Sequence, residues 1–301
     1  MALPSKVKIV EVGPRDGLQN EKEIIPAEVK IELVNLLTEA GFANIEAASF
    51  VSPKWVPQMA TSAEVMERIR RKRGVVYSAL TPNMKGFEAA LAAGADEVVI
   101  FGAASEAFSQ RNINCSIAES IERFRDVVLA AKQHGIRLRG SVSCSFGCPY
   151  QGEVPADSVA GVVRGFRELG CDEIDIADTI GVGTPNQVHA VMERAAREFP
   201  IERLSGHFHD TYGQAIGNIY ASMEVGISIF HSSVAGLGGC PYAVGATGNV
   251  STEDVLFLMS GLGIDTGIDL DKVVDAGQFI SRHLGRQAAS RTGNAITARH
   301  R

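Results

Sequence analysis

The sequence predicts an α/β protein folded as a closed (β/α)8 TIM barrel, with a single domain over residues 1–301. Short apolar runs alternate eight times with longer amphipathic runs, which is the pattern of parallel strands joined by helices. Eight such units spread over about 250 residues are typical of a closed barrel. An open doubly wound sheet is the alternative, but no G-x-G-x-x-G motif follows the first predicted strand.

Each predicted strand is followed by a helix, and small residues mark the junctions. The expected strand and helix pairs are 8–13 with 26–40, 44–49 with 62–71, 75–80 with 84–92, 97–102 with 117–134, 138–144 with 156–169, 173–177 with 185–198, 204–209 with 214–225, and 228–234 with 252–260. Glycine recurs where a helix ends and the next strand begins, as in ELGCDE at 168–173. Residues from about 269 to 301 are expected to form a helical extension, a helix followed by a polar tail, which covers a barrel end or a subunit contact.

The composition is that of an ordinary globular protein, and it excludes several functions. The net charge is −6 and no basic run occurs, so no nucleic-acid partner is expected. No apolar stretch approaches the ~20 residues of a membrane span, so no membrane partner is expected either. The ends of the chain show neither a signal peptide nor a peroxisomal tail, which predicts a cytoplasmic protein. The five cysteines lack disulfide spacing, and four of them are expected to be reduced and mostly buried.

Polar and ionisable residues gather where the predicted strands end. In barrel enzymes the active site lies at the carboxyl ends of the strands, so these positions are the candidates for chemistry. They are Arg15 and Asp16 after the first strand, Glu46 and Ser49 in the second, Asp178 and Thr179 after the sixth, His207, His209 and Asp210 at the seventh, and Cys240 and Asn249 after the eighth. A purely structural barrel needs few such residues at one end.

The segment GHFHDTYGQAIGN contains two histidines that are candidates for metal binding. Side chains at positions i and i+2 of a strand face the same way, so His207 and His209 project side by side. An isolated H-x-H pair is weak evidence, but Asp16 and Asn249 add a carboxylate and an amide oxygen at the same end of the barrel. This mixed oxygen and nitrogen set suits Mg²⁺ or Mn²⁺. Two histidines and one carboxylate also suit non-haem Fe(II), although in another sequence context.

A glycine-rich segment follows the eighth predicted strand, from Gly236 to Gly248, and contains five glycines. So many permissive residues favour a mobile lid. The segment is not a phosphate-binding loop, because no G-K-[ST] follows. Cys240 lies within it, either as a catalytic thiol or as a buried cysteine in a packed turn.

Seven segments together resemble the 3-hydroxy-3-methylglutaryl-CoA lyase family. They are VGPRDGLQNEK, SFVSPKWVPQMA, NINCSI, SCSFGCPYQG, ADTIGVGTP, HFHDTYGQA and GLGGCPYAVGATGN. The R-D-G and H-x-H elements are shared with Claisen-type synthases and aldolases of the superfamily, whereas the cysteine-containing segment is more specific to the lyases. The resemblance covers nearly the whole chain. It implies a metal-dependent retro-Claisen cleavage of 3-hydroxy-3-methylglutaryl-CoA to acetyl-CoA and acetoacetate.

The resemblance also implies a role for each candidate residue. The cation, Mg²⁺ or Mn²⁺, is held by Asp16, His207, His209 and Asn249. Four residues are expected to be catalytic. Arg15 faces the thioester oxygen, and Cys240 protonates the carbon, alone or with His207. Glu46 either orients Arg15 or shares in proton transfer, and Asp178 either supports a metal ligand or Arg15 or simply precedes a helix. The acyl-CoA substrate is contacted by Lys22, Asn112 and Ser116 at its CoA moiety and by Gln19 and Ser49 nearer the acyl group.

Three other interpretations stay open. The chain departs from the family pattern at Ala48, where threonine is expected, and at Phe208, which is bulkier than its counterpart in the animal enzymes, so the acyl preference can differ. One alternative is therefore a lyase for a longer-branched 3-hydroxyglutaryl-CoA. Another is a condensing synthase or aldolase, which gives no reason for Cys240, and a third is a binding or scaffold barrel that takes no cation. A homodimer is the default oligomer for such barrels.

Overall fold

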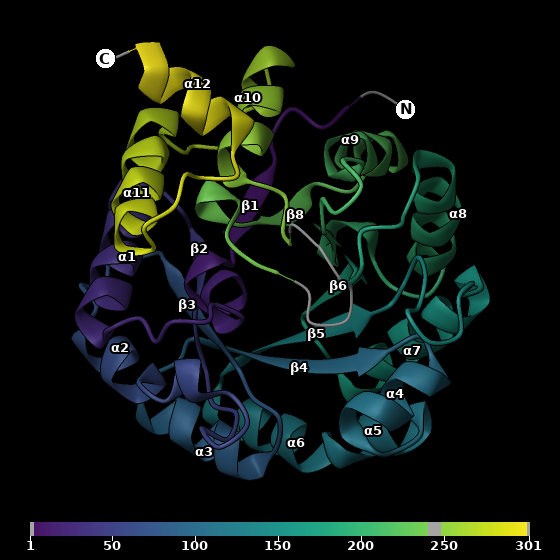
Figure 1. Ribbon diagram of the computed structural model, residues 1–301. Helices are drawn as coiled ribbons and strands as arrows, with labels where there is room; N and C mark the ends of the chain where they lie inside the picture. The colour runs from purple at the N-terminus through teal and green to yellow at the C-terminus, as the bar shows by residue number, and fades with distance from the viewer. Residues whose placement is uncertain (1–2, 240–247, 300–301) are drawn as a thin grey trace.

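A ring of parallel strands, closed between the first and the last, forms the centre of the molecule (Figure 1). The computed structural model describes residues 3–239 and 248–299. Strand β1 pairs with both β2 and β8, which closes the barrel and confirms the predicted fold. The strands are β1 (Lys8–Glu11), β2 (Asn44–Ser49), β3 (Val76–Leu80), β4 (Glu97–Ala103), β5 (Arg137–Ser143), β6 (Glu173–Asp178), β7 (Leu204–Phe208) and β8 (Ile229–Ser232).

Helices surround this ring and cover the outward faces of the strands (Figure 1). They are α1 (Ala27–Ala40), α2 (Ser62–Arg68), α3 (Met84–Ala92), α4 (Glu106–Ile113), α5 (Ile117–Arg123), α6 (Arg125–His134), α7 (Ala156–Leu169), α8 (Pro185–Ala196), α9 (Ala215–Val225), α10 (Thr252–Gly261), α11 (Leu270–His283) and α12 (Arg291–Arg299). The main apolar core lies between the helices and the outer faces of the strands. None of these helices combines the length and the apolar character needed to cross a membrane.

Two parts of the helical layer differ from the expectation. The single helix expected at 117–134 is two helices, α5 and α6, and Phe124 lies between them. The Phe124 ring packs edge-on against Phe101 of β4, with 5.7 Å between ring centroids, a tertiary contact that the helical pattern does not reveal. Helix α4, inserted before α5, was not expected, and its start is capped by Ser105.

The C-terminal extension contains a second helix in place of the expected polar tail. Helix α11 forms where a helix from about residue 269 was predicted, and it packs against α1. Helix α12 then forms on α10, because the carboxylate of Asp254 accepts a hydrogen bond from the backbone N–H of Thr292 at 2.7 Å. The Ser290 hydroxyl accepts another from the N–H of Gly293 at 2.9 Å. This helix start depends on Asp254, which lies far away in the sequence.

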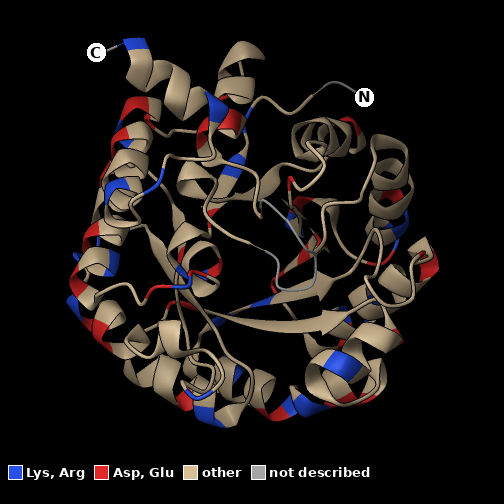
Figure 2. Cartoon of the chain, viewed as in Figure 1, with Lys and Arg blue, Asp and Glu red and all other residues tan. Residues whose placement is uncertain are grey.

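The interior of the barrel is unusually polar. TIM barrels commonly fill this space with Val, Ile and Leu, yet here several strands direct charged side chains into it, and a small separate apolar cluster lies beside β1 and β8. The amino-terminal end is crossed by ion pairs, including Lys8 Nζ to Glu173 Oε2 at 2.6 Å and Arg137 Nε to Glu97 Oε2 at 3.2 Å. Figure 2 shows a group of charged residues at the centre of the ring, in addition to those on the outer helices. Buried charge therefore extends along the axis toward the other end.

Two buried glutamates fasten the turns at the carboxyl end of the barrel. Glu11 accepts hydrogen bonds from the N–H of Gly13 at 2.8 Å and of Val234 at 2.9 Å. Glu253 accepts from the N–H of Ala235 at 2.9 Å, a residue in the left-handed region with φ of 58°. Burial raises the pKa of Glu11 to about 7 and the pKa of Glu253 to about 8. Both glutamates therefore support the turns, and burial favours the protonated form of each side chain.

We expect Glu253→Gln to flatten the dependence of stability on pH. In the folded protein Glu253 keeps its proton up to a pH of about 8. In the unfolded chain a glutamate loses its proton at about pH 4.3. The free energy of unfolding should therefore decrease as the pH rises between these values, by up to ~1.4 kcal/mol per pH unit for each such proton. Urea unfolding across this range measures the slope.

The exposed residue Glu67 provides the control, since Glu67→Gln should leave the slope unchanged. A Glu253→Gln variant that retains the full slope of the wild-type protein would show that this carboxyl is not the group responsible.

Candidate active site

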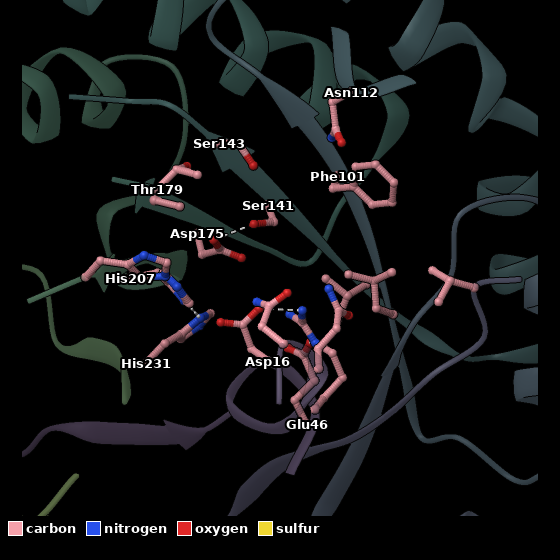
Figure 3. A pocket seen from close by; sticks show the side chains of 18 of the residues that line it. Asp16, Glu46, Phe101, Asn112, Ser141, Ser143, Asp175, Thr179, His207 and His231 are labelled. Carbon is pink, nitrogen blue, oxygen red and sulfur yellow. Dashed lines mark hydrogen bonds and ion pairs between the residues drawn. The ribbon is translucent and has the colours of Figure 1, made fainter. Parts of the chain in front are cut away.

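A cavity of about 320 Å³ opens at the carboxyl ends of the strands. One side of it is polar and is formed by residues of the turn after β1 and of strands β2, β5, β6, β7 and β8 (Figure 3). The other side is apolar and is lined by Val51, Val56, Leu80, Val99, Phe101 and Phe108. The cavity is where the position of active sites in barrel enzymes predicts it.

Strand β7 places the two histidines as the strand period predicts. His207 lines the cavity, and Phe208 is buried on the opposite side, where its ring lies 5.7 Å from that of Phe146. Phe208 therefore packs away from the site, as expected. His209 comes just after the strand, and an isolated bridge pairs it with Asn249. This pairing brings the chain after the glycine-rich segment back to the end of β7.

Three of the predicted ligands converge at the cavity. The possible ligand atoms of Asp16, His207 and His209 all lie within 4.8 Å of one another. Asn249 adjoins them, because its amide nitrogen donates a hydrogen bond to Asp16 Oδ2 at 2.8 Å. Nδ1 of His209 is buried and has no hydrogen-bond partner within residues 3–239 and 248–299. A histidine with such a nitrogen, close to a carboxylate and a second imidazole, fits a divalent cation.

The electrostatics of this cluster also suit a cation. Burial lowers the pKa of His207 and of His209 below the ordinary value, which keeps both rings neutral at neutral pH. Burial alone would raise the pKa of Asp16, but Arg15, the two histidines and the hydrogen bond from Asn249 together outweigh it and hold that pKa well below its usual range. Neutral imidazoles and an ionised carboxylate are the forms that bind metal ions. The cluster therefore needs no proton loss before it binds.

Arg15 is held between two carboxylates. It lies in the π-helical turn Gly13–Gly17 and donates from Nε to Glu46 Oε1 and from Nη1 to Asp16 Oδ1, the latter at 2.6 Å. Burial opposes the charge of Glu46, but Arg15 and Arg139 together hold the pKa of Glu46 below its ordinary value. The two hydrogen bonds occupy two of the five N–H groups of a guanidinium. The others donate to no residue within the described part of the chain.

Asp178 fastens a turn beside the cavity. Its carboxylate accepts hydrogen bonds from the N–H of Val182 at 3.1 Å and of Gly183 at 2.9 Å. Burial raises the pKa of Asp178 to about 6, against the effect of these bonds. Its described hydrogen bonds go to the backbone rather than to Arg15 or to a predicted ligand. Asp178 therefore supports the chain after β6, where Thr179 lines the cavity.

The predicted substrate residues lie in different places. Gln19 and Asn112 line the cavity, and their contacts with an acyl-CoA stay a prediction. Lys22 is exposed on the surface, and Ser116 caps the start of α5 through a capping box with Glu119. Ser49 is buried and lines a different hollow, between β2 and helices α2 and α3. Cys240 and the central part of the glycine-rich segment lie outside the described residues.

Five polar residues of the strands were missed by the sequence analysis. Ser141, Ser143, Asp175 and His231 line the cavity, and Arg139 is fully buried beneath it. Asp175 Oδ1 accepts a hydrogen bond from the Ser141 hydroxyl at 2.8 Å (Figure 3). Their signal in the sequence was a polar or charged residue at alternate positions of a predicted strand, which marks a polar barrel interior.

Comparison with known proteins identifies the family. Residues 6–280 match the family described as HMGL-like. The chain belongs to this family. It is 60% identical over 299 residues to a Pseudomonas aeruginosa protein named 3-hydroxy-3-isohexenylglutaryl-CoA/hydroxy-methylglutaryl-CoA lyase, covering 99% of this chain and 100% of that protein. It is 54% identical over 293 residues to the mitochondrial hydroxymethylglutaryl-CoA lyase of Homo sapiens, covering 97% of this chain and 90% of that one.

Solved structures of HMGL-like proteins share this fold. The crystal structure of the hydroxymethylglutaryl-CoA lyase from Pseudomonas aeruginosa has a TM-score of 0.98 at 60% identity, covering 99% of this chain and 100% of that chain. The structure of the HMG-CoA lyase from Brucella melitensis has a TM-score of 0.91 at 52% identity, covering 93% of this chain and 99% of that chain. The predicted resemblance is therefore confirmed.

We expect His209→Ala to abolish most of the affinity for a divalent cation. The change removes one of three converging donors. The loss should exceed the ~10–100-fold that is typical when only a residue supporting a ligand is removed. Calorimetric titration with Mn²⁺ measures it. His189, which pairs with Glu224 at 3.0 Å on the surface, supplies the control variant His189→Ala. Equal affinity of wild-type protein and His209→Ala would remove His209 from the ligand set.

Proposed function

We propose that this chain cleaves 3-hydroxy-3-methylglutaryl-CoA to acetyl-CoA and acetoacetate. The observation that carries this proposal is the convergence of Arg15 with Asp16, His207 and His209 at one cavity. Membership of the HMGL-like family and the names of the relatives support it. Because the similar proteins are named lyases, cleavage is favoured over the condensing reaction of a synthase.

The reaction requires two changes of protonation around one breaking bond. The tertiary hydroxyl loses its proton as a ketone forms, and the electrons of the broken carbon–carbon bond move into the enolate of the thioester. That enolate then takes a proton on carbon to become an acetyl group. When bound, a divalent cation such as Mg²⁺ or Mn²⁺ lowers the pKa of a coordinated hydroxyl and stabilises the charge that develops on its oxygen. Asp16, His207, His209 and Asn249 are the residues that would hold it.

Arg15 would stabilise the enolate. Glu46 and Asp16 restrain its guanidinium from two sides, so its orientation is set before substrate binds. A positive group fixed in advance beside a developing negative charge needs little reorganisation during the reaction. We therefore assign Glu46 to orienting Arg15. Gln19 and Asn112 would contact the substrate from the rim of the cavity, and Lys22 would reach the CoA moiety from the surface.

The decisive experiment is an assay of acetoacetate release from 3-hydroxy-3-methylglutaryl-CoA. We expect activity that disappears after treatment with a chelator and returns on addition of Mg²⁺ or Mn²⁺, because the cation acidifies the hydroxyl. Activity that is indifferent to chelation would contradict the assignment of the cation. Absence of acetoacetate at all cation concentrations, with Mn²⁺ still bound in calorimetry, would contradict the proposed reaction.

A longer-branched thioester is a second candidate substrate. The apolar side of the cavity, which includes Leu80, Val99 and Phe101, can accept a larger acyl substituent than methyl. The name of the Pseudomonas aeruginosa relative includes the isohexenyl compound. The same assay with 3-hydroxy-3-isohexenylglutaryl-CoA compares the two, and the larger kcat/KM identifies the preferred substrate.

Cys240 is the proposed donor of the proton to carbon. We expect Cys240→Ser to lower kcat by about 10²-fold or more, as is typical when a general acid is lost. Its affinity for Mn²⁺ should match that of the wild-type protein, since the thiol is not among the proposed ligands. The buried Cys171, in the connection between α7 and β6, offers the control variant Cys171→Ser. Near-normal turnover of Cys240→Ser would exclude this thiol from the reaction.

Oligomeric state and location stay predictions. A homodimer and a cytoplasmic location are expected from the sequence. The names of the relatives give different cellular locations. The protein of Danio rerio, 56% identical, is named cytoplasmic, and that of Homo sapiens is named mitochondrial.

A further inference from the structure

The chain contains a single tryptophan, and its side chain lies in solvent. Trp55 is 87% exposed, the largest exposed fraction among the large apolar side chains at the surface of residues 3–239 and 248–299. Tryptophan is highly buried on average in folded proteins. Removing so much apolar surface from water is favourable, so an indole in this position favours a ligand that covers it.

The backbone around Trp55 is ordered by hydrogen bonds. The N–H groups of Trp55 and Val56 donate to the carbonyl of Ser52, at 2.9 Å and 3.0 Å. Pro57 follows at the start of a short 3-10 helix, and its ring restricts the backbone there. The exposed indole is therefore carried by a defined turn.

This turn adjoins the cavity of the candidate active site. Val51 and Val56, which precede and follow Trp55 in the sequence, both line the cavity. Asn112 of α4 lines it from another side. Trp55 therefore lies at the rim, on a segment that also forms part of the cavity wall.

A buried glutamine joins this segment to the one that carries Lys22. The Gln58 side chain donates from Nε2 to the carbonyl of Glu23 at 2.8 Å, and its Oε1 accepts from the N–H of Ile25 at 2.9 Å. The two segments are thus held side by side at the rim. Lys22 is the residue predicted to contact the CoA moiety.

The charges on these two segments suit a phosphate group. Lys22 and Lys54 are both exposed. Glu21 is paired with Arg286, which leaves the exposed Glu23 as the opposing charge. Lysine side chains are common partners of phosphates. An aromatic face with lysines on the same segments matches a nucleotide, which combines a flat base with phosphates.

The size of the cavity places the nucleotide end of a CoA thioester outside it. The cavity volume of about 320 Å³ is near the lower end of the range of about 300–1,000 Å³ that is usual for ligand pockets. A thioester that reaches Arg15 therefore leaves its adenine, at the far end of the pantetheine chain, near the rim. Bases stack on aromatic side chains with a sizeable gain in affinity.

We propose that Trp55 is a substrate-binding residue that stacks on the adenine of the CoA thioester, an inference that rests on the proposed function. Lys22 and Lys54 lie on the same two segments and attract the phosphates. Trp55 is remote from the breaking carbon–carbon bond, so it contributes to binding and leaves the chemical step unchanged.

The fluorescence of Trp55 tests the proposal directly. Because the chain has no other tryptophan, the signal reports on this site alone. We expect coenzyme A and adenosine 3′,5′-bisphosphate to quench the fluorescence of the wild-type protein, because both contain the base. Pantetheine, which lacks the base, should leave it unchanged.

Kinetics of variants provide the second readout. We expect Trp55→Ala to raise the KM for 3-hydroxy-3-methylglutaryl-CoA by about 10-fold with little change in kcat. The same acyl group on pantetheine should be cleaved equally well by the wild-type protein and the variant. Trp55→Phe keeps an aromatic face and should recover most of the lost affinity. Phe257→Ala, at a 64% exposed position on α10, is the matched control.

The proposal is overturned if coenzyme A binds in calorimetry without changing the fluorescence of Trp55, if pantetheine quenches it equally, or if Trp55→Ala keeps the wild-type KM. It is also overturned if Trp55→Ala separates a dimer into monomers and keeps wild-type affinity for coenzyme A, since the indole would then contact a second copy of the chain. Quenching by coenzyme A without release of acetoacetate would contradict the proposed function alone. A protein that binds no coenzyme A would contradict both.

Discussion

The burial of charge along the barrel axis is the constraint on which the rest of this structure depends. Isolated ionised groups are costly inside a protein, so each needs an opposite charge or hydrogen bonds close by. Arg139 is fully buried and lies among Glu46, Glu97 and Glu173. Removing one partner of such a pair commonly costs about 3–5 kcal/mol, because the other charge remains buried without compensation. Each of these charged residues therefore depends on the others for its stability inside the barrel.

The same constraint determines the chemistry at the mouth of the cavity. Arg15 can be buried there only because Glu46 and Asp16 neutralise it, and their pairing keeps both carboxylates ionised. The neighbouring histidines respond to burial in the opposite way and stay neutral. Ionised oxygen donors beside neutral nitrogen donors are the combination that a divalent cation prefers. Electrostatic compensation and cation binding thus depend on the same side chains.

The two buried glutamates at the carboxyl end of the barrel connect the turns that carry residues of the site. Glu11 links the turn that contains Arg15 to the turn after β8, and Glu253 holds Ala235 in that second turn. The chain then passes through Gly236 toward the glycine-rich segment that contains Cys240. Hydrogen bonds to the two buried glutamates therefore stabilise the turn Val234–Gly236.

The sequence by itself determined the barrel, the H-x-H pair on one face, and most of the residues gathered at the carboxyl end. These features depend on local periodicity, because strands repeat every two residues, and on the rule that parallel strands bring their ends together. The break at Phe124 and helix α12 escaped prediction, since each depends on a contact with a distant element.

Only the tertiary structure decided which polar residues meet. It placed Ser49 on another hollow, directed Asp178 to the backbone of a turn, and joined Arg139 to His231 across 92 residues of sequence. Asn249 and Asp16 meet over 233 residues. Such pairs depend on the register of all the intervening strands and on which side chains can reach across the barrel. No local pattern in the sequence encodes either of these.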